Sequence, residues 1–256
     1  MRKKSEMERL IGIMATLRGP KGCPWDRKQN HETLVPYLVE EAHEAIEAIY
    51  EKNYKKLEEE LGDLLLQVVF HAQLAREKKR FDIEKVAKGI SAKLIRRHPH
   101  VFGKKEKLTS AQVLENWERR KLKEKKTGVL ESIPKTLPIL FRAQRVQEKA
   151  AQFGFDWKKA GQVVPKLKEE IKEIEKDLKK KSGKLEEEIG DLFFTTINLS
   201  RHLKVNPEKA LKTSVDKFEK RFAFIESSLK KQKKNLGEVG LEELDRLWNK
   251  AKKLKT

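Results

Sequence analysis

Carboxylate side chains recur at matched spacings in two parts of this chain. The pattern Glu-Glu-x-x-Glu starts at Glu40 and again at Glu169. A second pattern, Glu-x-x-Asp, follows each of them, starting at Glu60 and at Glu188. Carboxylate oxygens are the ligands that hard divalent cations prefer, so both segments are candidate metal sites.

The letters around the acidic patterns repeat as well. LEEELGDLLLQVVF occupies residues 57–70, and LEEEIGDLFFTTIN occupies residues 185–198 of the 256. Self-similarity at a fixed offset indicates one ancestral unit used twice. A chain of this length also has room for two ordinary domains. We therefore predict an N-terminal repeat over residues 1–126 and a C-terminal repeat over residues 127–256.

The elements that must position these residues are helices. Apolar residues recur with helical periodicity nearly everywhere, and no convincing alternating strand pattern is present. GCPWDRKQN at residues 22–30 is predicted to be a loop. We expect an all-α fold, a tandem repeat of two helical bundles. The main predicted helices cover residues 32–51, 54–78 and 83–97 in the first repeat, and 165–180, 185–203 and 207–231 in the second.

Four carboxylates in each repeat should converge on one patch. At about 100° of rotation per helical residue, the last two glutamates of Glu-Glu-x-x-Glu lie along one side of the apolar stripe of their helix. Both acidic residues of Glu-x-x-Asp lie along the corresponding side of the apolar stripe of the next helix. The connecting loops are short, so the two helices should be antiparallel neighbours whose equivalent flanks meet. The carboxylates are Glu41, Glu44, Glu60 and Asp63 in the first repeat and Glu170, Glu173, Glu188 and Asp191 in the second.

Such a patch predicts a site for a hard metal ion. Negative charges gathered at a core margin are costly unless cations bind there. An oxygen-only ligand set suits Mg²⁺ or Mn²⁺ rather than zinc. One copy alone would more often be a solvated helix face, but two copies matched in residue type, face and spacing favour a metal site. Glu40-x-x-His43 resembles half of a di-iron site, yet Lys172 replaces the histidine in the second repeat, which argues against iron.

Cationic and aromatic residues accompany the acidic patch in both repeats. A Lys/Arg pair spaced by four residues lies on one flank of a predicted helix, and a tryptophan stands near the end of each repeat. Beside a metal, the cations would hold a polyphosphate and the indole could stack on a base. These residues are Lys93, Arg97 and Trp117 in the first repeat and Lys217, Arg221 and Trp248 in the second.

Composition narrows the class of protein. The net charge is +19, and 39% of the residues are charged. The basic runs lack interleaved aromatic residues that could stack on nucleic-acid bases. We therefore interpret these runs as solvated helix faces rather than as a nucleic-acid-binding surface. The single cysteine, Cys23, excludes an intrachain disulfide and fits a reducing compartment. No segment has the apolar core of a signal peptide or a membrane span, so we expect a cytoplasmic protein without membrane contact.

Several hairpin residues are apolar but lie outside the main stripes, so further helices must cover them. We therefore expect a homodimer. The residues are Leu66, Val69 and Phe70 in the first repeat and Phe194 and Leu199 in the second.

The quoted motifs, with GCPWD, EEAHE, RRHPHVF and IPKTLPILFRAQRVQEKAAQFGFDW, resemble the MazG family of nucleoside triphosphate pyrophosphohydrolases over nearly the whole chain. The resemblance implies an all-α homodimeric enzyme that hydrolyses nucleoside triphosphates to monophosphate and pyrophosphate with Mg²⁺. Because stacking on a tryptophan tolerates any base, we expect broad base tolerance. The resemblance places the metal on Glu170, Glu173, Glu188 and Asp191, and nucleotide contacts on Lys166, Lys184, Lys217, Arg221 and Trp248. It also takes the C-terminal repeat as the catalytic one.

The residues themselves support the same ranking of the repeats. Tyr37 stands where the second repeat has Lys166, so the second repeat is the more cationic and should bind a triphosphate better. Glu169, turned away from the metal flank, is a candidate base acting through a water molecule. Two other functions remain open at this point: a basic helical nucleic-acid-binding protein, and a regulatory interaction protein with a structural metal site.

Overall fold

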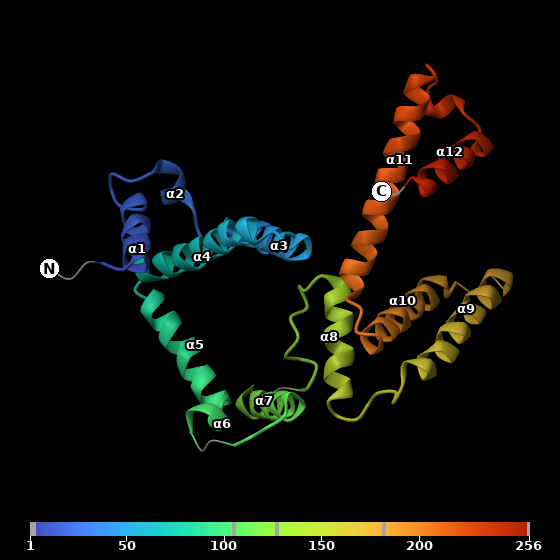
Figure 1. The fold of residues 1–256 in the computed structure, drawn as a ribbon. Coiled ribbons are helices and arrows are strands. Elements are labelled where there is room, and N and C mark those ends of the chain that lie inside the picture. The colour runs from blue at the N-terminus through green and yellow to red at the C-terminus, as the bar shows by residue number, and fades with distance from the viewer. Residues whose placement is uncertain (1–3, 104–105, 126–127, 181–182, 255–256) are drawn as a thin grey trace. The chain divides into compact units, whose positions relative to one another are not determined.

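The computed structural model describes residues 4–103, 106–125, 128–180 and 183–254, and these form helices, turns and loops without a strand (Figure 1). The predicted all-α fold is therefore confirmed. The chain divides into two compact units, Met1–Arg120 and Lys121–Thr256. The predicted boundary between residues 126 and 127 lies outside the described residues.

The N-terminal unit is built on a hairpin of two antiparallel helices, α3 and α4 (Figure 1). Lys52 ends α3 in the left-handed conformation, with φ at 56°, and the Asn53 side chain then caps α4 by accepting a hydrogen bond from the Lys56 N–H at 3.1 Å. The helices of this part of the chain are α1 (Glu6–Leu17), α2 (Pro24–Lys28), α3 (Val35–Glu51), α4 (Tyr54–Glu77), α5 (Ile83–Arg97), α6 (Pro99–Phe102) and α7 (Ser110–Lys125). The segment predicted as a loop thus contains the short helix α2, which Pro24 starts.

Helix α1 closes the core of this unit. Met14 of α1 is buried together with Val69, Phe70 and Leu74 of α4 and with Leu34. Val69 and Phe70 were predicted to need a further helix, and α1 of the same unit supplies it, so these two residues give no support to a dimer. Arg18, just after α1, donates two hydrogen bonds of 2.8 Å to the Glu77 carboxylate at the end of α4.

The C-terminal unit repeats the hairpin with α9 and α10 (Figure 1). Helix α8 packs against α10, and α12 packs along α11 around Ile225, Leu229 and Leu247. The sequence periodicity bounded α9, α10 and α11 closely, but α8 and α12 were not predicted as separate helices. The helices are α8 (Ile139–Ala151), α9 (Val163–Lys180), α10 (Leu185–His202), α11 (Pro207–Lys231) and α12 (Leu241–Lys253).

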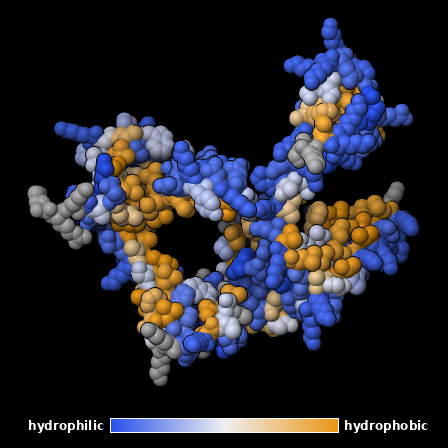
Figure 2. Space-filling view, in the orientation of Figure 1, coloured by the Kyte–Doolittle hydropathy of each residue, from blue (hydrophilic) through white to orange (hydrophobic). Residues whose placement is uncertain are grey.

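Large apolar side chains stay exposed along the hairpins. Figure 2 shows hydrophobic surface over α5 and over the α9–α10 hairpin. The chain exposes 19584 Å². This area is larger than the roughly 14,000 Å² that two separate compact domains, each of half the 29.9 kDa mass, would together expose. Exposed apolar residues include Leu61 and Val68 on α4 and Ile171, Leu178, Ile189, Phe193 and Phe194 on α9–α10.

Among the described residues, no helix has the length and apolar character that crossing a membrane would require.

Candidate active site

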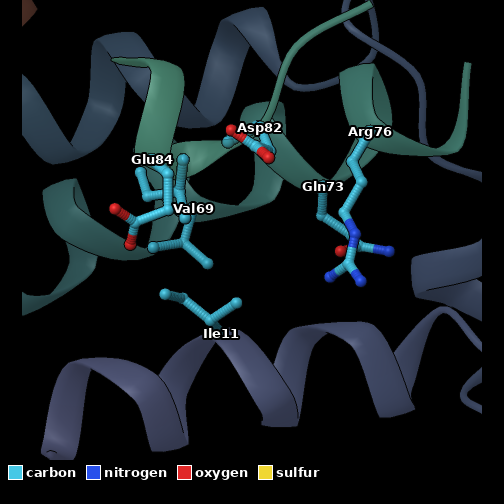
Figure 3. A pocket seen from close by; sticks show the side chains of 8 residues that line it. Ile11, Val69, Gln73, Arg76, Asp82 and Glu84 are labelled. Carbon is cyan, nitrogen blue, oxygen red and sulfur yellow. The ribbon is translucent and has the colours of Figure 1, made fainter. Parts of the chain in front are cut away.

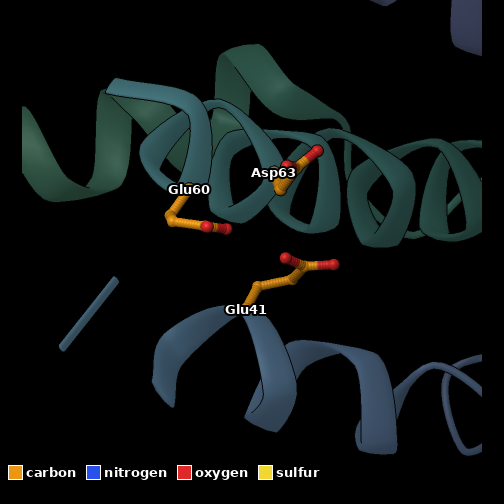
Figure 4. Close-up of side chains that lie close together, drawn as sticks. All are labelled: Glu41, Glu60 and Asp63. Atoms are coloured by element: carbon orange, nitrogen blue, oxygen red, sulfur yellow. The ribbon is translucent and has the colours of Figure 1, made fainter. Parts of the chain in front are cut away.

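Three carboxylates come together in each unit. In each group, one oxygen per residue can be chosen so that all three lie within 4.8 Å of one another. Figure 4 shows Glu41 of α3 pointing across the hairpin at Glu60 and Asp63 of α4. The group in the C-terminal unit has the same construction, with Glu170 on α9 and Glu188 and Asp191 on α10. The three-residue spacing of Glu-x-x-Asp holds both of its carboxylates on one helix face.

The fourth carboxylates that the sequence assigns to each site, Glu44 and Glu173, lie outside these groups of three. Their charges nevertheless act on the groups. Burial, and after it the charges of Asp63 and Glu44, raise the pKa of Glu41 above its ordinary value. Burial and then the charge of Glu44 raise the pKa of Glu60 in the same way. Whether Glu44 and Glu173 bind metal stays a prediction.

Asp177 adds a further negative charge to the C-terminal group, and the sequence analysis missed it. Burial, followed by the charges of Glu173 and Asp177, raises the pKa of Glu188. Asp177 is 7% exposed and follows Glu170 by seven residues, so it lies on the same face of α9. The seven-residue spacing from Glu170 is the feature of the sequence that could have indicated that Asp177 belongs to this site. The oxygen-only donor set and the mutual repulsion of its members fit a hard divalent cation, which would relieve that repulsion.

Lys166 places an ammonium group inside the C-terminal site. Its Nζ lies 2.9 Å from a Glu170 oxygen and 3.0 Å from a Glu169 oxygen, and these contacts, Glu170 first, raise the pKa of Lys166. The Glu170 side chain is only 3% exposed, whereas that of Glu169 is 57% exposed. In the N-terminal unit the corresponding Tyr37 packs edge-on against Trp25, with 5.7 Å between ring centroids.

Lys184 stands at the start of α10, one turn before Glu188. Its backbone N–H donates a hydrogen bond of 3.1 Å to Asp177, which ties the first turn of α10 to α9. The Lys184 side chain is exposed.

The remaining predicted nucleotide contacts lie on α11 and α12. The Trp248 ring contacts Phe218, with 5.1 Å between centroids, and the Arg221 guanidinium carbon lies 5.3 Å from the Trp248 centroid. The Arg221 Nε is buried and has no hydrogen-bond partner among the described residues. Lys217 is exposed one turn before Arg221. The structure therefore brings these three residues together, and the ring contacts of Trp248 are with α11.

A cavity of about 290 Å³ in the N-terminal unit lies apart from these residue sets. Figure 3 shows Ile11 of α1 facing Val69 and Gln73 of α4 across it, with Asp82 and Glu84 at the start of α5. No residue of the carboxylate groups lines this cavity, which lies where α1, α4 and the start of α5 meet.

The fold and these sites define an all-α protein with one carboxylate centre in each of two repeats, and comparison with known proteins gives its family. The family model of the MazG nucleotide pyrophosphohydrolase domain matches residues 29–102 and 159–223, which include both carboxylate groups. The chain belongs to the MazG family, and it is an enzyme of the nucleoside triphosphate pyrophosphohydrolase class. The resemblance seen in the sequence is thereby confirmed.

Some relatives match this chain over almost their full length. The nucleoside triphosphate pyrophosphohydrolase/pyrophosphatase MazG of Thermotoga maritima is 50% identical over 248 residues, which cover 96% of this chain and 95% of that protein. The nucleoside triphosphate pyrophosphohydrolase of Escherichia coli K12 is 42% identical over 257 residues, or 97% of this chain and 98% of that protein. A Mycolicibacterium smegmatis protein of the same name is 36% identical over 154 residues, which are 57% of this chain and 47% of that protein.

Proposed function

We propose that this enzyme hydrolyses nucleoside and deoxynucleoside triphosphates to monophosphate and pyrophosphate with Mg²⁺, and that its C-terminal repeat, residues 127–256, carries the reaction. The observation behind the proposal is the group formed by Glu170, Glu188 and Asp191, whose oxygens lie close enough to share one cation. The names of the relatives support the substrate class.

The carboxylates of α9 and α10, with Glu173 as a fourth, are the residues that would hold Mg²⁺, and Mn²⁺ could replace it. When bound, such a metal neutralises phosphate charge and lowers the pKa of a coordinated water molecule. Glu169 is exposed beside the group and is our candidate for a base that takes a proton through a water molecule. Lys166 forms ion pairs with both Glu169 and Glu170. When a nucleotide binds, its ammonium group would exchange a carboxylate partner for a phosphate.

The two repeats differ in the cation beside the metal group, and this difference supports the choice of the C-terminal one. A triphosphate with its metal still carries net negative charge, so an ammonium at the site favours its binding. Lys166 supplies that charge in the C-terminal unit, whereas Tyr37 is engaged with Trp25 in the N-terminal unit. We propose the N-terminal group of Glu41, Glu44, Glu60 and Asp63 as a second metal site.

Lys184, Lys217 and Arg221 are proposed phosphate contacts. Trp248 is proposed to contribute to nucleotide binding by holding the Arg221 guanidinium, whose buried Nε has no acceptor in the described protein. This contribution should not depend on the base, in keeping with broad base tolerance.

We propose that the enzyme is a homodimer. The α9–α10 hairpin leaves Ile171, Phe193 and Phe194 between 42% and 62% exposed, together with other large apolar side chains. A second copy of the chain would cover such a surface, and obligate homodimers bury apolar area of this kind. A cytoplasmic location is proposed on the basis of the single cysteine, which fits a reducing compartment.

The direct test is to incubate the full chain with each nucleoside triphosphate and Mg²⁺ and to separate the products by chromatography. Monophosphate with pyrophosphate is expected as the primary product pair, and excess chelator should abolish its formation. Diphosphate with orthophosphate would contradict the assigned bond. Activity that persists in chelator would contradict the role of the metal.

A further inference from the structure

The first carboxylate of α10 lies very close to the start of its helix. Helix α10 begins at Leu185, so that Glu188 stands in its first turn. The corresponding Glu60 lies further inside its helix, because α4 begins at Tyr54. The first turn of a helix has N–H groups without partners in the helix, and helix ends fray unless such groups are held. The position of Glu188 therefore depends on what fixes the start of α10.

The residue just before α10 does not cap the helix with its own side chain. Lys184 occupies the N-cap position and makes no capping hydrogen bond, because a lysine side chain has no acceptor for the N–H groups of the first turn. In the N-terminal unit, by contrast, the Asn53 side chain accepts a hydrogen bond from the Lys56 N–H. The start of α10 therefore needs an acceptor from another part of the chain.

Asp177 of α9 supplies this acceptor. Its Oδ2 accepts a hydrogen bond of 3.1 Å from the Lys184 N–H, and the Lys184 carbonyl oxygen accepts one of 3.1 Å from the Glu188 N–H. Asp177 is thus linked through one residue to the backbone of Glu188. Its carboxylate also lies at the N-terminal end of α10, where the helix dipole favours a negative charge. The side chain belongs to a residue that is only 7% exposed, which restricts its movement.

The N-terminal repeat has an alanine in place of this carboxylate. Asp177 follows Glu170 by seven residues, and the residue seven positions after Glu41 is Ala48, which is 0% exposed. A buried carboxylate is costly unless it accepts hydrogen bonds. The acidic residue is therefore present in the hairpin whose Glu-x-x-Asp pattern starts in the first turn, and absent where Asn53 caps a helix that begins earlier.

We propose that Asp177 is a positioning residue of the C-terminal site, which fixes the first turn of α10 and so holds the Glu188 carboxylate against Glu170 and Asp191. The inference rests on the proposed function, because it concerns the carboxylates assigned to the metal. The hydrogen-bond acceptor of Asp177 carries this role rather than its charge. A carboxylate that binds metal must be held within roughly 0.5 Å of its working position, so a frayed first turn would weaken metal binding and slow the reaction.

Asp177→Ala and Asp177→Asn separate the acceptor from the charge. Both remove the negative charge, but the asparagine oxygen can still accept the hydrogen bond from the Lys184 N–H. Titration calorimetry uses Mn²⁺ alone and chains that also carry Asp63→Asn, which weakens the N-terminal group. Mn²⁺ should bind about tenfold less tightly to the Ala variant than to the Asn variant. With Mg²⁺ and ATP, kcat should likewise be about tenfold lower in the Ala variant than in the Asn variant.

Asp82→Ala and Asp82→Asn are the matched controls. Asp82 also holds the start of a helix, because its side chain accepts a hydrogen bond of 2.9 Å from the Lys85 N–H, but it belongs to neither carboxylate group. Asp82→Ala and Asp177→Ala should both lower the thermal midpoint. Only the change at Asp177 should also alter Mn²⁺ affinity and kcat, which a purely structural role would leave unchanged.

Equal Mn²⁺ affinity and equal kcat in Asp177→Asn and Asp177→Ala would overturn the positioning role, because the lost charge alone would then explain any effect. A lowered midpoint in Asp177→Ala without a change in Mn²⁺ affinity or kcat would overturn it as well. If Asp177→Ala does not fold, hydrogen exchange of the amides in the first turn of α10 decides: equal protection in Asp177→Asn and in the unaltered chain supports the role, and faster exchange in Asp177→Asn contradicts it.

The proposed function fails in a different way. If the unaltered chain released no pyrophosphate from any nucleoside triphosphate, the assigned reaction would be wrong. The Mn²⁺ titrations would still decide whether Asp177 positions the carboxylate group.

Discussion

The guanidinium carbon of Arg221 lies 5.3 Å from the ring centroid of Trp248, and Arg97 stands in the same relation to Trp117 at 5.1 Å. The two pairs occupy equivalent places in the two repeats, on helices that follow each carboxylate hairpin. The tryptophans lie outside the segments that match the family model, yet both repeats keep the contact. A cation over an indole ring is attracted by its face, so each pair holds an arginine in a defined position.

Replacing Trp248 by Ala should weaken the binding of all nucleoside triphosphates by a similar factor. The loss of the contact with Arg221 should cost about 0.5–2 kcal/mol of binding free energy. KM for the four ribonucleotides, measured beside the thermal midpoint, tests this. A loss confined to one base would show that Trp248 reads the base, and a lowered midpoint with unchanged KM would show that it only packs.

Asp191→Asn should remove most of the activity, whereas Asp63→Asn should leave much of it. Both residues belong to a three-carboxylate group, and in the C-terminal group the Lys166 ammonium lies 2.9 Å from Glu170, whereas Tyr37 stands at the corresponding position of the N-terminal unit. Initial rates of pyrophosphate release are compared after circular dichroism and light scattering have shown unchanged helicity and mass. Equal damage from the two substitutions would mean that the repeats share the chemistry.

Lys166→Gln should have opposite effects on the metal and on the nucleotide. Without nucleotide, Mn²⁺ should bind the C-terminal group a few times more tightly, because Glu170 is released from its ion pair at 2.9 Å. The KM for nucleoside triphosphate should rise, because a phosphate loses a cation. Titration calorimetry with Mn²⁺ alone gives the first quantity. Tyr37→Lys is the matched change in the N-terminal unit, where Mn²⁺ affinity should fall.

The stability of the N-terminal unit should decrease as the pH falls below 6.5. The Nδ1 atoms of His31 and His71 lie 2.8 Å apart, and burial, followed by the charge of His31, lowers the pKa of His71 from its usual 6.5. The unfolded chain then binds the proton more readily than the folded one, so stability is complete above pH 6.5 and is lost on the acid side. Urea unfolding at pH 7.5 and 5.5 measures the difference. His71→Asn should reduce it, and an unchanged difference would contradict this role of His71.

Phe193→Glu should disrupt the proposed dimer. Phe193 is 62% exposed on α10, and a charge there would be buried in any interface that covers the hairpin. Light scattering should give a mass of twice 29.9 kDa for the unaltered protein and a lower mass for the variant at micromolar concentration. A monomeric mass for the unaltered protein would rule out the homodimer.

The sequence by itself determined the helical repeats and the convergence of Glu41 with Glu60 and Asp63. These features depend on a period of 3.6 residues and on a short connection between neighbouring helices, both of which are local properties of the chain. For the same reason helix α11 was predicted closely, at residues 207–231, and in the structure Asn206 caps it and Pro207 begins it. The contact of Lys166 with Glu170 also spans only four residues.

Only the tertiary structure decided which distant helices meet. It placed α1 over Val69 and Phe70, where the sequence left open which helix would cover them. It likewise joined Gln147 of α8 to the backbone of Phe194 on α10, 47 residues away. Periodicity tells which face of a helix is apolar but carries no information about its partner, because the partner depends on the path of the intervening chain and on how side chains of particular sizes fill the space between helices.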